Sequence, residues 1–328
     1  MNTYKLTNLV KKLRDFRGLT RKFSLGEILN ILEEATYDDA GFFDVGDLKV
    51  VVSCDGIVES LVKSDPWLAG YYSVLVNVND VVAKGARPIG FVNIISSRSR
   101  EIRRKVAEGM RDGLRKYELK LLKGHMHPDT SYDSVDAAVV GVAKNVLPST
   151  AAKVGDALII AVDLVGKFSC TDWLKTFDST TKKSSREVLD RLNVMMELAE
   201  RGLARAARDI SGPGIPGTIA MLCESSQVGA SVNLESIPKP ETLKLEDWLE
   251  TYPGIGFIVS ANQPEESLQL LRSHKLAAST IGEIKEEKEI WLSHRGQRAL
   301  FLDLKRESVF GMPRSEEVEQ SRLTETKP

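Results

Sequence analysis

The chain has 328 residues, enough for about two domains of ~150 residues each. Its net charge of −1 gives no electrostatic support for nucleic acid or an anionic membrane as a partner. The three cysteines are too few and too scattered for a disulfide framework or a zinc site, and no run of about 18 apolar residues predicts a membrane-spanning helix. The first residues, MNTYKLTNLVKKLRDF, lack the apolar core of a signal peptide, so we expect a cytoplasmic protein.

The first half of the chain alternates predicted helices and strands. Helical spacing of apolar residues predicts helices at 24–34, 67–85 and 101–117. The first of these helices has Ser24 as its N-cap and Glu27 three residues later. Strands are predicted at 48–54, 90–95, 119–122 and 135–143, with a polar loop at 124–134. This alternation is typical of an α+β protein built from α/β layers.

The sequence changes character near residue 150. A linker and turn at 148–156 place a boundary between a domain of residues 1–149 and a domain of residues 150–310. The second domain is predicted to contain a strand at 157–163, a loop at 166–185, a helix at 186–201 ended by Gly202, a turn at 210–217 and a helix at 217–225. Residues 311–328 are polar and charged, and we expect them to be disordered.

Acidic residues recur where predicted strands end, loops turn or a helix presents a polar side chain. They are Asp38, Asp39, Asp55, Asp80, Asp129 and Asp209. Mg2+ prefers oxygen ligands and keeps several waters, so it needs few carboxylates per ion beside phosphate groups. The series therefore predicts Mg2+ bound against phosphate oxygens. Each position alone also has a simpler interpretation, such as a turn or cap for Asp38–Asp39 and a hairpin turn for Asp55.

The helix at 67–85 carries a polar stripe opposite its apolar side. The stripe consists of Ser73, Asn77, Asp80 and Lys84. A solvated face with an Asp80–Lys84 ion pair would explain it without any function. The helix is apolar enough to be buried, however, and a metal–phosphate cluster would supply the partners that buried polar groups need.

Two loops add candidate ligands. In the loop 123–133, His125 and His127 make a weak zinc pattern, and Asp129 is the better ligand for a hard cation. The glycines of 212–217 fit GxGxxG formally, but they follow ARAARD, which we interpret as helical, so the context of a nicotinamide or flavin site is missing. Free N–H groups at a helix start beside Asp209 and Ser211 suit a phosphate better.

Taken in order, these segments resemble the superfamily of aminoimidazole ribonucleotide (AIR) synthetase over about residues 25–305. The superfamily includes thiamine-monophosphate kinase, selenophosphate synthetase and a hydrogenase-maturation dehydratase, and this chain is most similar to its AIR synthase-related branch. The family motifs GDDxA, S-T-D, N-L-S-D-L-A-A-M-G-A, G-G-[DEH]-T and D-[IV]-[ST]-x-G-[GL] are matched at 37–40, 53–55, 77–86, 123–126 and 209–214.

The resemblance implies a PurM-like two-domain fold whose N-terminal mixed sheet forms a barrel with that of its mate in a homodimer. It implies an Mg-ATP-dependent phosphotransferase or ATP-activating synthetase, with ATP and Mg2+ between the domains and a small-molecule phosphate acceptor. The implied metal ligands are Asp38, Asp39, Asp55, Asp80 and Asp129. The implied nucleotide contacts are Asn77, Lys84, Gly124, His125, Gly212 and Gly214. Asp209 and Ser211 are the implied catalytic residues, on the acceptor side.

The chain also departs from the family pattern. Tyr37 and Lys123 replace glycines, and Lys84 replaces the methionine of the helix motif. These changes motivate an alternative, a catalytically silent ATP-binding scaffold. An oxidoreductase that uses the glycine turn is a third hypothesis. The basic residues Arg17, Arg21 and Lys22 are interpreted either as a lid over phosphates or as a solvated stretch.

Overall fold

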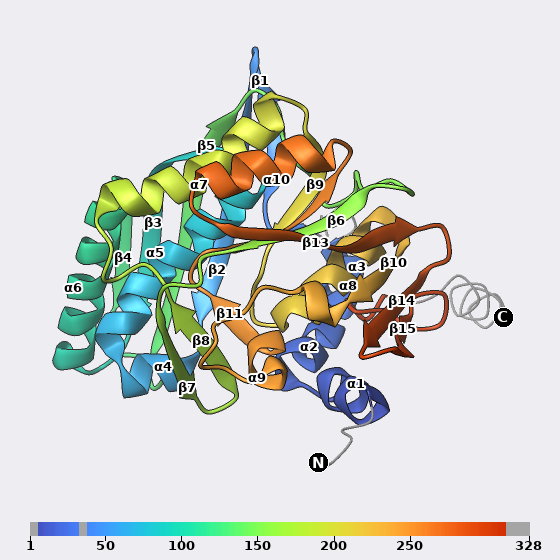
Figure 1. The fold of residues 1–328 in the computed structure, drawn as a ribbon. Helices are drawn as coiled ribbons and strands as arrows, with labels where there is room; N and C mark the ends of the chain where they lie inside the picture. The colour runs from blue at the N-terminus through green and yellow to red at the C-terminus, as the bar shows by residue number, and fades with distance from the viewer. Residues whose placement is uncertain (1–5, 33–37, 313–328) are drawn as a thin grey trace, which may run out of the picture.

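The computed structural model describes residues 6–32 and 38–312 (Figure 1). Short helices open the chain: α1 (Leu6–Arg14), α2 (Arg17–Thr20), the 3-10 helix η1 (Arg21–Ser24) and α3 (Leu25–Leu32). Tyr37 and the expected disordered tail from residue 313 onward lie outside the described residues. No helix in the described part of the chain is both long and apolar enough to cross a membrane.

The first sheet has five strands in the order β1-β2-β5-β3-β4. They are β1 (Gly41–Val45), β2 (Leu48–Ile57), β3 (Arg87–Ser96), β4 (Lys120–His127) and β5 (Ser134–Ala143). The sheet is mixed, because β3 and β4 are parallel and the other neighbours are antiparallel. α4 (Glu59–Ser64), α5 (Pro66–Ala83) and α6 (Arg100–Lys116) pack with this sheet, α5 directly on β2 and β5.

Local sequence signals begin and end α5. The Asp65 carboxylate accepts a hydrogen bond from the Leu68 backbone N–H, and Pro66 occupies the first turn, where its missing N–H costs nothing. The helix ends at Gly85, whose φ of 75° favours glycine. Nearly the whole helix is buried, including its polar residues. α5 therefore carries Asn77 and Asp80 into the interior.

The second sheet has seven strands in the order β15-β14-β10-β13-β6-β12-β9. They are β6 (Ala157–Val162), β9 (Ala204–Asp209), β10 (Gly229–Asn233), β12 (Gly256–Ala261), β13 (Ala277–Lys285), β14 (Glu289–His294) and β15 (Gln297–Asp303). A smaller sheet contains β7 (Lys167–Thr171), β8 (Leu174–Asp178) and β11 (Thr251–Pro253). The remaining elements are α7 (Ser185–Glu200), α8 (Gly214–Ser226), η2 (Leu234–Ser236), α9 (Leu245–Leu249) and α10 (Pro264–Ser273).

The alternation of β6 divides the interior into two cores. Leu158, Ile160 and Val162 face a core that includes α8 and α1. Ile159 and Ala161 face the other core, which contains α7 and α10 and continues into α5 and the first sheet. The two domains therefore share one continuous apolar core.

Several sequence predictions of local structure are wrong. The predicted loop at 166–185 contains the hairpin of β7 and β8, and ARAARD is strand β9 rather than helix. Asp55 lies within β2, so the hairpin-turn interpretation of this residue is also wrong. β4 extends to His127, and α8 already begins at Gly214. The alternating polar residues of these short strands carry no continuous apolar signal, and alanine and arginine favour helix by intrinsic propensity.

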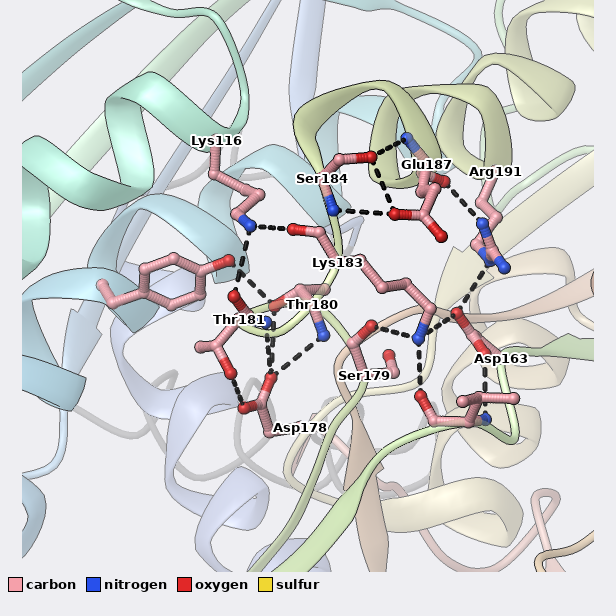
Figure 2. Close-up of polar contacts among 12 residues, drawn as sticks. Lys116, Asp163, Asp178, Ser179, Thr180, Thr181, Lys183, Ser184, Glu187 and Arg191 are labelled. Carbon is pink, nitrogen blue, oxygen red and sulfur yellow. Dashed lines mark hydrogen bonds and ion pairs between the residues drawn. The ribbon is translucent and has the colours of Figure 1, made fainter.

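The loop between β8 and α7 joins the two domains (Figure 2). From the first domain, Lys116 Nζ donates to the Thr181 carbonyl at 3.2 Å, and Tyr71 Oη donates to Thr180 Oγ1 at 3.0 Å. On the other side, Asp163 Oδ2 lies 3.1 Å from Lys183 Nζ and 2.8 Å from Arg191 Nε. We call this network, made of Lys116, Asp163, the loop 178–184 and Arg191, the interdomain latch.

Candidate functional site

A pocket of about 800 Å³ lies between the two domains. α5 and β2 line it from the first domain, and β9 and the turn 211–213 line it from the second. Residues of η1 and α3 also line it, so the N-terminal segment forms part of its wall. The volume lies within the usual range for small-molecule sites.

Asp39, Asp80 and Asp209 converge in this pocket. Each offers a carboxylate oxygen, and the three oxygens lie within 4.8 Å of one another. The residues come from the segment before β1, from α5 and from the end of β9. Asp80 is 5% exposed and Asp209 is 1% exposed. Carboxylates at such distances repel one another unless protons or cations compensate their charge.

A hydrogen-bond network fixes Asp80. Ser53 Oγ donates to Asp80 Oδ2 at 2.5 Å, and Asn77 Oδ1 accepts from the Asp55 backbone N–H at 2.9 Å. Asn77 Nδ2 in turn donates to the Ser73 carbonyl at 2.9 Å. The polar stripe of α5 is thus fully buried, and its interpretation as a solvated face is wrong.

The same helix is tied to the second domain next to the carboxylates. Asn79 Nδ2 donates to the Gly254 carbonyl at 3.0 Å and to Tyr252 Oη at 3.2 Å. Because Asn79 precedes Asp80, these bonds hold this part of α5 against β11 of the smaller sheet.

The surroundings raise the pKa of several carboxyl groups in the pocket. Burial raises the pKa of Asp80 well above its ordinary value, and the charges of Asp209, Asp55 and Asp39 add to the effect. Burial, followed by the charge of Asp39, raises the pKa of Asp209 to about 8. Partial burial of its carboxyl group and the charge of Asp39 raise the pKa of Asp55, against the opposing charges of Lys22 and Arg21.

Asp38 and Asp39 have cationic partners. Lys84 Nζ contacts Asp38 Oδ1 and lies 3.1 Å from Asp39 Oδ2, and Arg208 lies 2.5 Å from Asp39 Oδ1. Burial pushes the pKa of Asp38 upward, but Lys84 and Arg208 outweigh it and lower this pKa. Lys84 therefore pairs with these two carboxylates. The solvated-face interpretation required it to pair with Asp80 instead.

The three clustered carboxylates fit a divalent cation. Asp209 Oδ1 is buried and accepts no hydrogen bond from a described residue, and Asp39 Oδ2 has the Lys84 ammonium at 3.1 Å as an ion-pair partner. A donor set made only of carboxylate oxygens suits a hard cation such as Mg2+. A bound cation would relieve the repulsion and give Asp209 Oδ1 a partner.

Basic residues of the N-terminal segment face the same pocket. Arg21 and Lys22 line it, and the guanidinium groups of Arg17 and Arg21 lie 5.6 and 5.1 Å from the centre of the Trp173 ring. A close approach fixes the segment beside them, since a Cβ on Gly18 would lie 2.1 Å from the Gly212 carbonyl oxygen. The lining of the pocket thus includes both the carboxylates and the cations Arg21 and Lys22 of the N-terminal segment.

The remaining predicted site residues fall into separate groups. Ser211 and Gly212 line the pocket together with the carboxylates, and Gly214 begins α8 directly behind them. Asp209, expected on the acceptor side, lies beside Asp39 and Asp80 instead. Asn77 and Lys84 are buried behind the pocket wall.

The loop residues Gly124, His125 and Asp129 do not line the pocket. Gly124 and His125 lie on β4, whose residues are all exposed, and Asp129 is exposed in the loop that follows it. Their roles as metal or nucleotide ligands stay predictions.

Two features of the site were missed or misread in the sequence. Arg208 and Ser149 complete the partners of Asp38 and Asp39, and only the basic residue directly before Asp209 gave any signal of this. The glycine-rich turn does follow a strand, but β9 is an antiparallel edge strand. It therefore lacks the parallel βαβ context of a dinucleotide site.

Comparison with known proteins places these features in a family. The N-terminal domain of AIR synthase-related proteins matches residues 37–143, and the C-terminal domain of the same family matches residues 153–294. An uncharacterised protein of Methanocaldococcus jannaschii is 34% identical, with 93% of this chain and 99% of that protein covered. A thiamine-monophosphate kinase of Pyrococcus abyssi is 26% identical, with 67% of this chain and 74% of the kinase covered.

Solved structures show the same fold. The structure of Thermotoga maritima PurL complexed with ADP superposes with a TM-score of 0.76 at 17% identity, covering 96% of this chain and 55% of that one. This chain thus spans about half the length of PurL. ThiL complexed with AMPPCP and TMP gives a TM-score of 0.65 at 15% identity, covering 84% of this chain and 95% of that one. The chain has a PurM-like fold and belongs to the family of AIR synthase-related proteins.

Proposed function

We propose that the protein is an Mg-ATP-dependent phosphotransferase or ATP-activating synthetase that acts on a small metabolite. The observation that carries this proposal is the convergence of Asp39, Asp80 and Asp209 in the interdomain pocket. Relatives named thiamine-monophosphate kinase and selenide, water dikinase support it, as do the ADP and AMPPCP complexes among the structural neighbours. The family likeness indicates ATP chemistry, and the pocket indicates where it would take place.

The residues of the pocket divide into proposed roles. Asp39, Asp80 and Asp209 would hold the divalent ion, with Asp55 beside them. Bound Mg2+ supplies charge neutralisation and alignment of the phosphates for transfer. Arg21 and Lys22 would bind phosphate oxygens from the opposite wall, because both line the pocket and act electrostatically on Asp55. The Ser211 hydroxyl and the backbone at Gly212 would face the acceptor.

The ion pairs at Asp38 and Asp39 favour a second candidate, a catalytically silent ATP-binding scaffold. Lys84 and Arg208 already compensate part of the negative charge that a catalytic metal site uses. Release of ADP across a panel of phosphorylatable metabolites separates the two functions. An enzyme turns over at least one acceptor, whereas a scaffold binds Mg-ATP tightly without turnover.

We also propose that the protein acts as a homodimer formed through the first sheet. Large apolar side chains are exposed on this sheet, as expected for a surface that a partner covers. They are Phe42, Phe43, Val45, Leu48, Ile89, Ile94, Leu121, Leu122 and Met126.

Calorimetry of the Asp80→Asn variant tests the proposed metal site. The wild type should bind ATP with Mg2+ and much more weakly without it, and Asp80→Asn should lose the Mg2+-dependent part, at least about 100-fold in affinity. Asp47→Asn is the matched control, because Asp47 lies exposed at the β1–β2 turn. Equal Mg-ATP affinity in Asp80→Asn and wild type would exclude Asp80 from the metal site.

A further inference from the structure

Lys84 is a fully buried lysine at the C-terminal end of α5. Four oxygen atoms surround its ammonium group: Asp38 Oδ1, Asp39 Oδ2 at 3.1 Å, Ser149 Oγ at 3.1 Å and the Ala207 carbonyl at 2.5 Å. A buried ammonium is costly without such partners. These carboxylate, hydroxyl and carbonyl oxygens are also the ligands that hard divalent cations prefer.

Both carboxylate oxygens of Asp38 accept hydrogen bonds from Lys84 or from groups beside it. Its Oδ1 accepts from Lys84 and from the Asp39 backbone N–H at 2.8 Å, and the Ser149 hydroxyl contributes a further bond at 2.5 Å. Its Oδ2 accepts from the Ser149 backbone N–H at 2.7 Å. Both oxygens therefore have protein partners, and Asp38 has no oxygen free for an ion while Lys84 is in place.

Asp39 connects the two parts of the network. It contacts Lys84 and Arg208 on one side and belongs to the cluster with Asp80 and Asp209 on the other. Lys84 thus lies one carboxylate away from the proposed metal site, on its buried side. In the family motif this position carries a methionine, which has a similar length and no charge.

We propose that the Lys84 ammonium is a resident cation that takes the place of a divalent ion between Asp38 and Asp39. The inference rests on the proposed function only in that the pocket binds divalent cations. It assigns Lys84 to the carboxylates rather than to the nucleotide, since Lys84 does not line the pocket and its ammonium is occupied by Asp38, Asp39 and the Ala207 carbonyl. The protein accordingly binds one divalent ion fewer than the same pocket would bind without the lysine.

Lys84→Met tests this directly, with Mn2+ as the probe and no nucleotide present. The number of bound Mn2+ ions is counted by calorimetry and by electron paramagnetic resonance, and thermal unfolding is recorded with and without Mn2+. Lys84→Met should bind one Mn2+ more than the wild type, and Mn2+ should raise its melting temperature by several degrees more. Methionine fills the space of the lysine stem and is a poor ligand for a hard cation.

The double variant Lys84→Met/Asp38→Asn is the control. It removes both charges, so it should fold without Mn2+ and bind the same number of ions as the wild type. Equal numbers of bound ions in Lys84→Met and wild type would overturn the inference. A Lys84→Met chain that stays unfolded at millimolar Mn2+, while the double variant folds, would overturn it as well.

The outcomes also separate this inference from the proposed function. A wild type that binds no Mn2+, beside a Lys84→Met variant that binds one ion, supports the resident cation and contradicts the proposed metal site. A wild type and a variant that each bind one ion support the metal site and overturn the resident cation. Absence of binding in both contradicts both.

Discussion

Two ion networks lie at the boundary between the domains, and they differ in their charge balance. At the interdomain latch, the Asp163 carboxylate meets two cations, Lys183 and Arg191 (Figure 2). Among the described residues of the pocket region, two buried cations, Lys84 and Arg208, accompany five carboxylates. The carboxylates are those of Asp38, Asp39, Asp55, Asp80 and Asp209. A network with balanced charges stabilises the fold. A network with excess anions destabilises it by electrostatic repulsion, which a bound cation would remove.

Breaking the latch should give the largest effect on stability. Asp163→Ala leaves Lys183 and Arg191 buried without their carboxylate and should lower the free energy of unfolding by about 3–5 kcal/mol, measured by urea denaturation. Lys63→Ala is the control, because its ion pair with Glu59 is exposed and should contribute little to the free energy of unfolding. A loss in Asp163→Ala no larger than that of the control would show that the ion pairs of Asp163 contribute little to stability.

The excess anions of the pocket should appear in the pH dependence of stability. The pKa of Asp209 is raised to about 8, so the native state holds a proton that the unfolded state releases. The stabilisation from this proton is complete below the ordinary pKa of 3.8 and is lost as pH rises through about 8. The melting temperature of the metal-free protein should therefore fall by several degrees between about pH 6 and pH 9.

Asp209→Asn should flatten this slope and melt higher than the wild type at the alkaline end, because it removes the charge whose burial is unfavourable. Saturating Mg2+ should flatten the slope of the wild type too. Scanning calorimetry in EDTA and in Mg2+ measures both effects. A metal-free wild type that becomes more stable as pH rises over this range would contradict the charge imbalance.

The smallest effect is expected at the opposite wall of the pocket. Lys22→Ala removes a cation that acts on Asp55, so Mg2+ alone should bind a few-fold more tightly, while Mg-ATP should bind about tenfold more weakly. Calorimetry with Mg2+ and with Mg-ATP measures the two affinities. Arg17→Ala is the control, because Arg17 pairs with Asp172 and does not line the pocket. Parallel changes in both affinities would show that Lys22 does not bind phosphate.

Sequence patterns predicted the elements with strong periodicity. The apolar stripe of α5 located the helix that carries Asp80, and the spacing of α6 and α7 was equally clear. The hairpin of β7 and β8 was missed because β7 buries few residues. Strand β9 was missed although most of its residues are buried, because its alanines and arginines favour helix by intrinsic propensity. The misassigned β9 is the strand that delivers Arg208 and Asp209 to the pocket.

The convergence of the acidic residues was only partly predictable. Sequence motifs named Asp39, Asp80 and Asp209, but no local pattern records which of them meet, because the contact depends on how β9 packs against α5. Likewise, the motifs marked Lys84 as a departure and left its partner open. The distant Ser149 and Ala207 complete its surroundings, and neither carries a signal of its own.

The apolar core that runs from the first sheet through α5 to α7 and α10 has a consequence for how ligands reach the pocket. The two halves of the chain cannot swing apart without exposing this core to water, which is costly. Opening of the two domains about a hinge is therefore unfavourable. We expect ligands to enter along the side formed by η1, α3 and the β7–β8 turn, where short elements line the pocket.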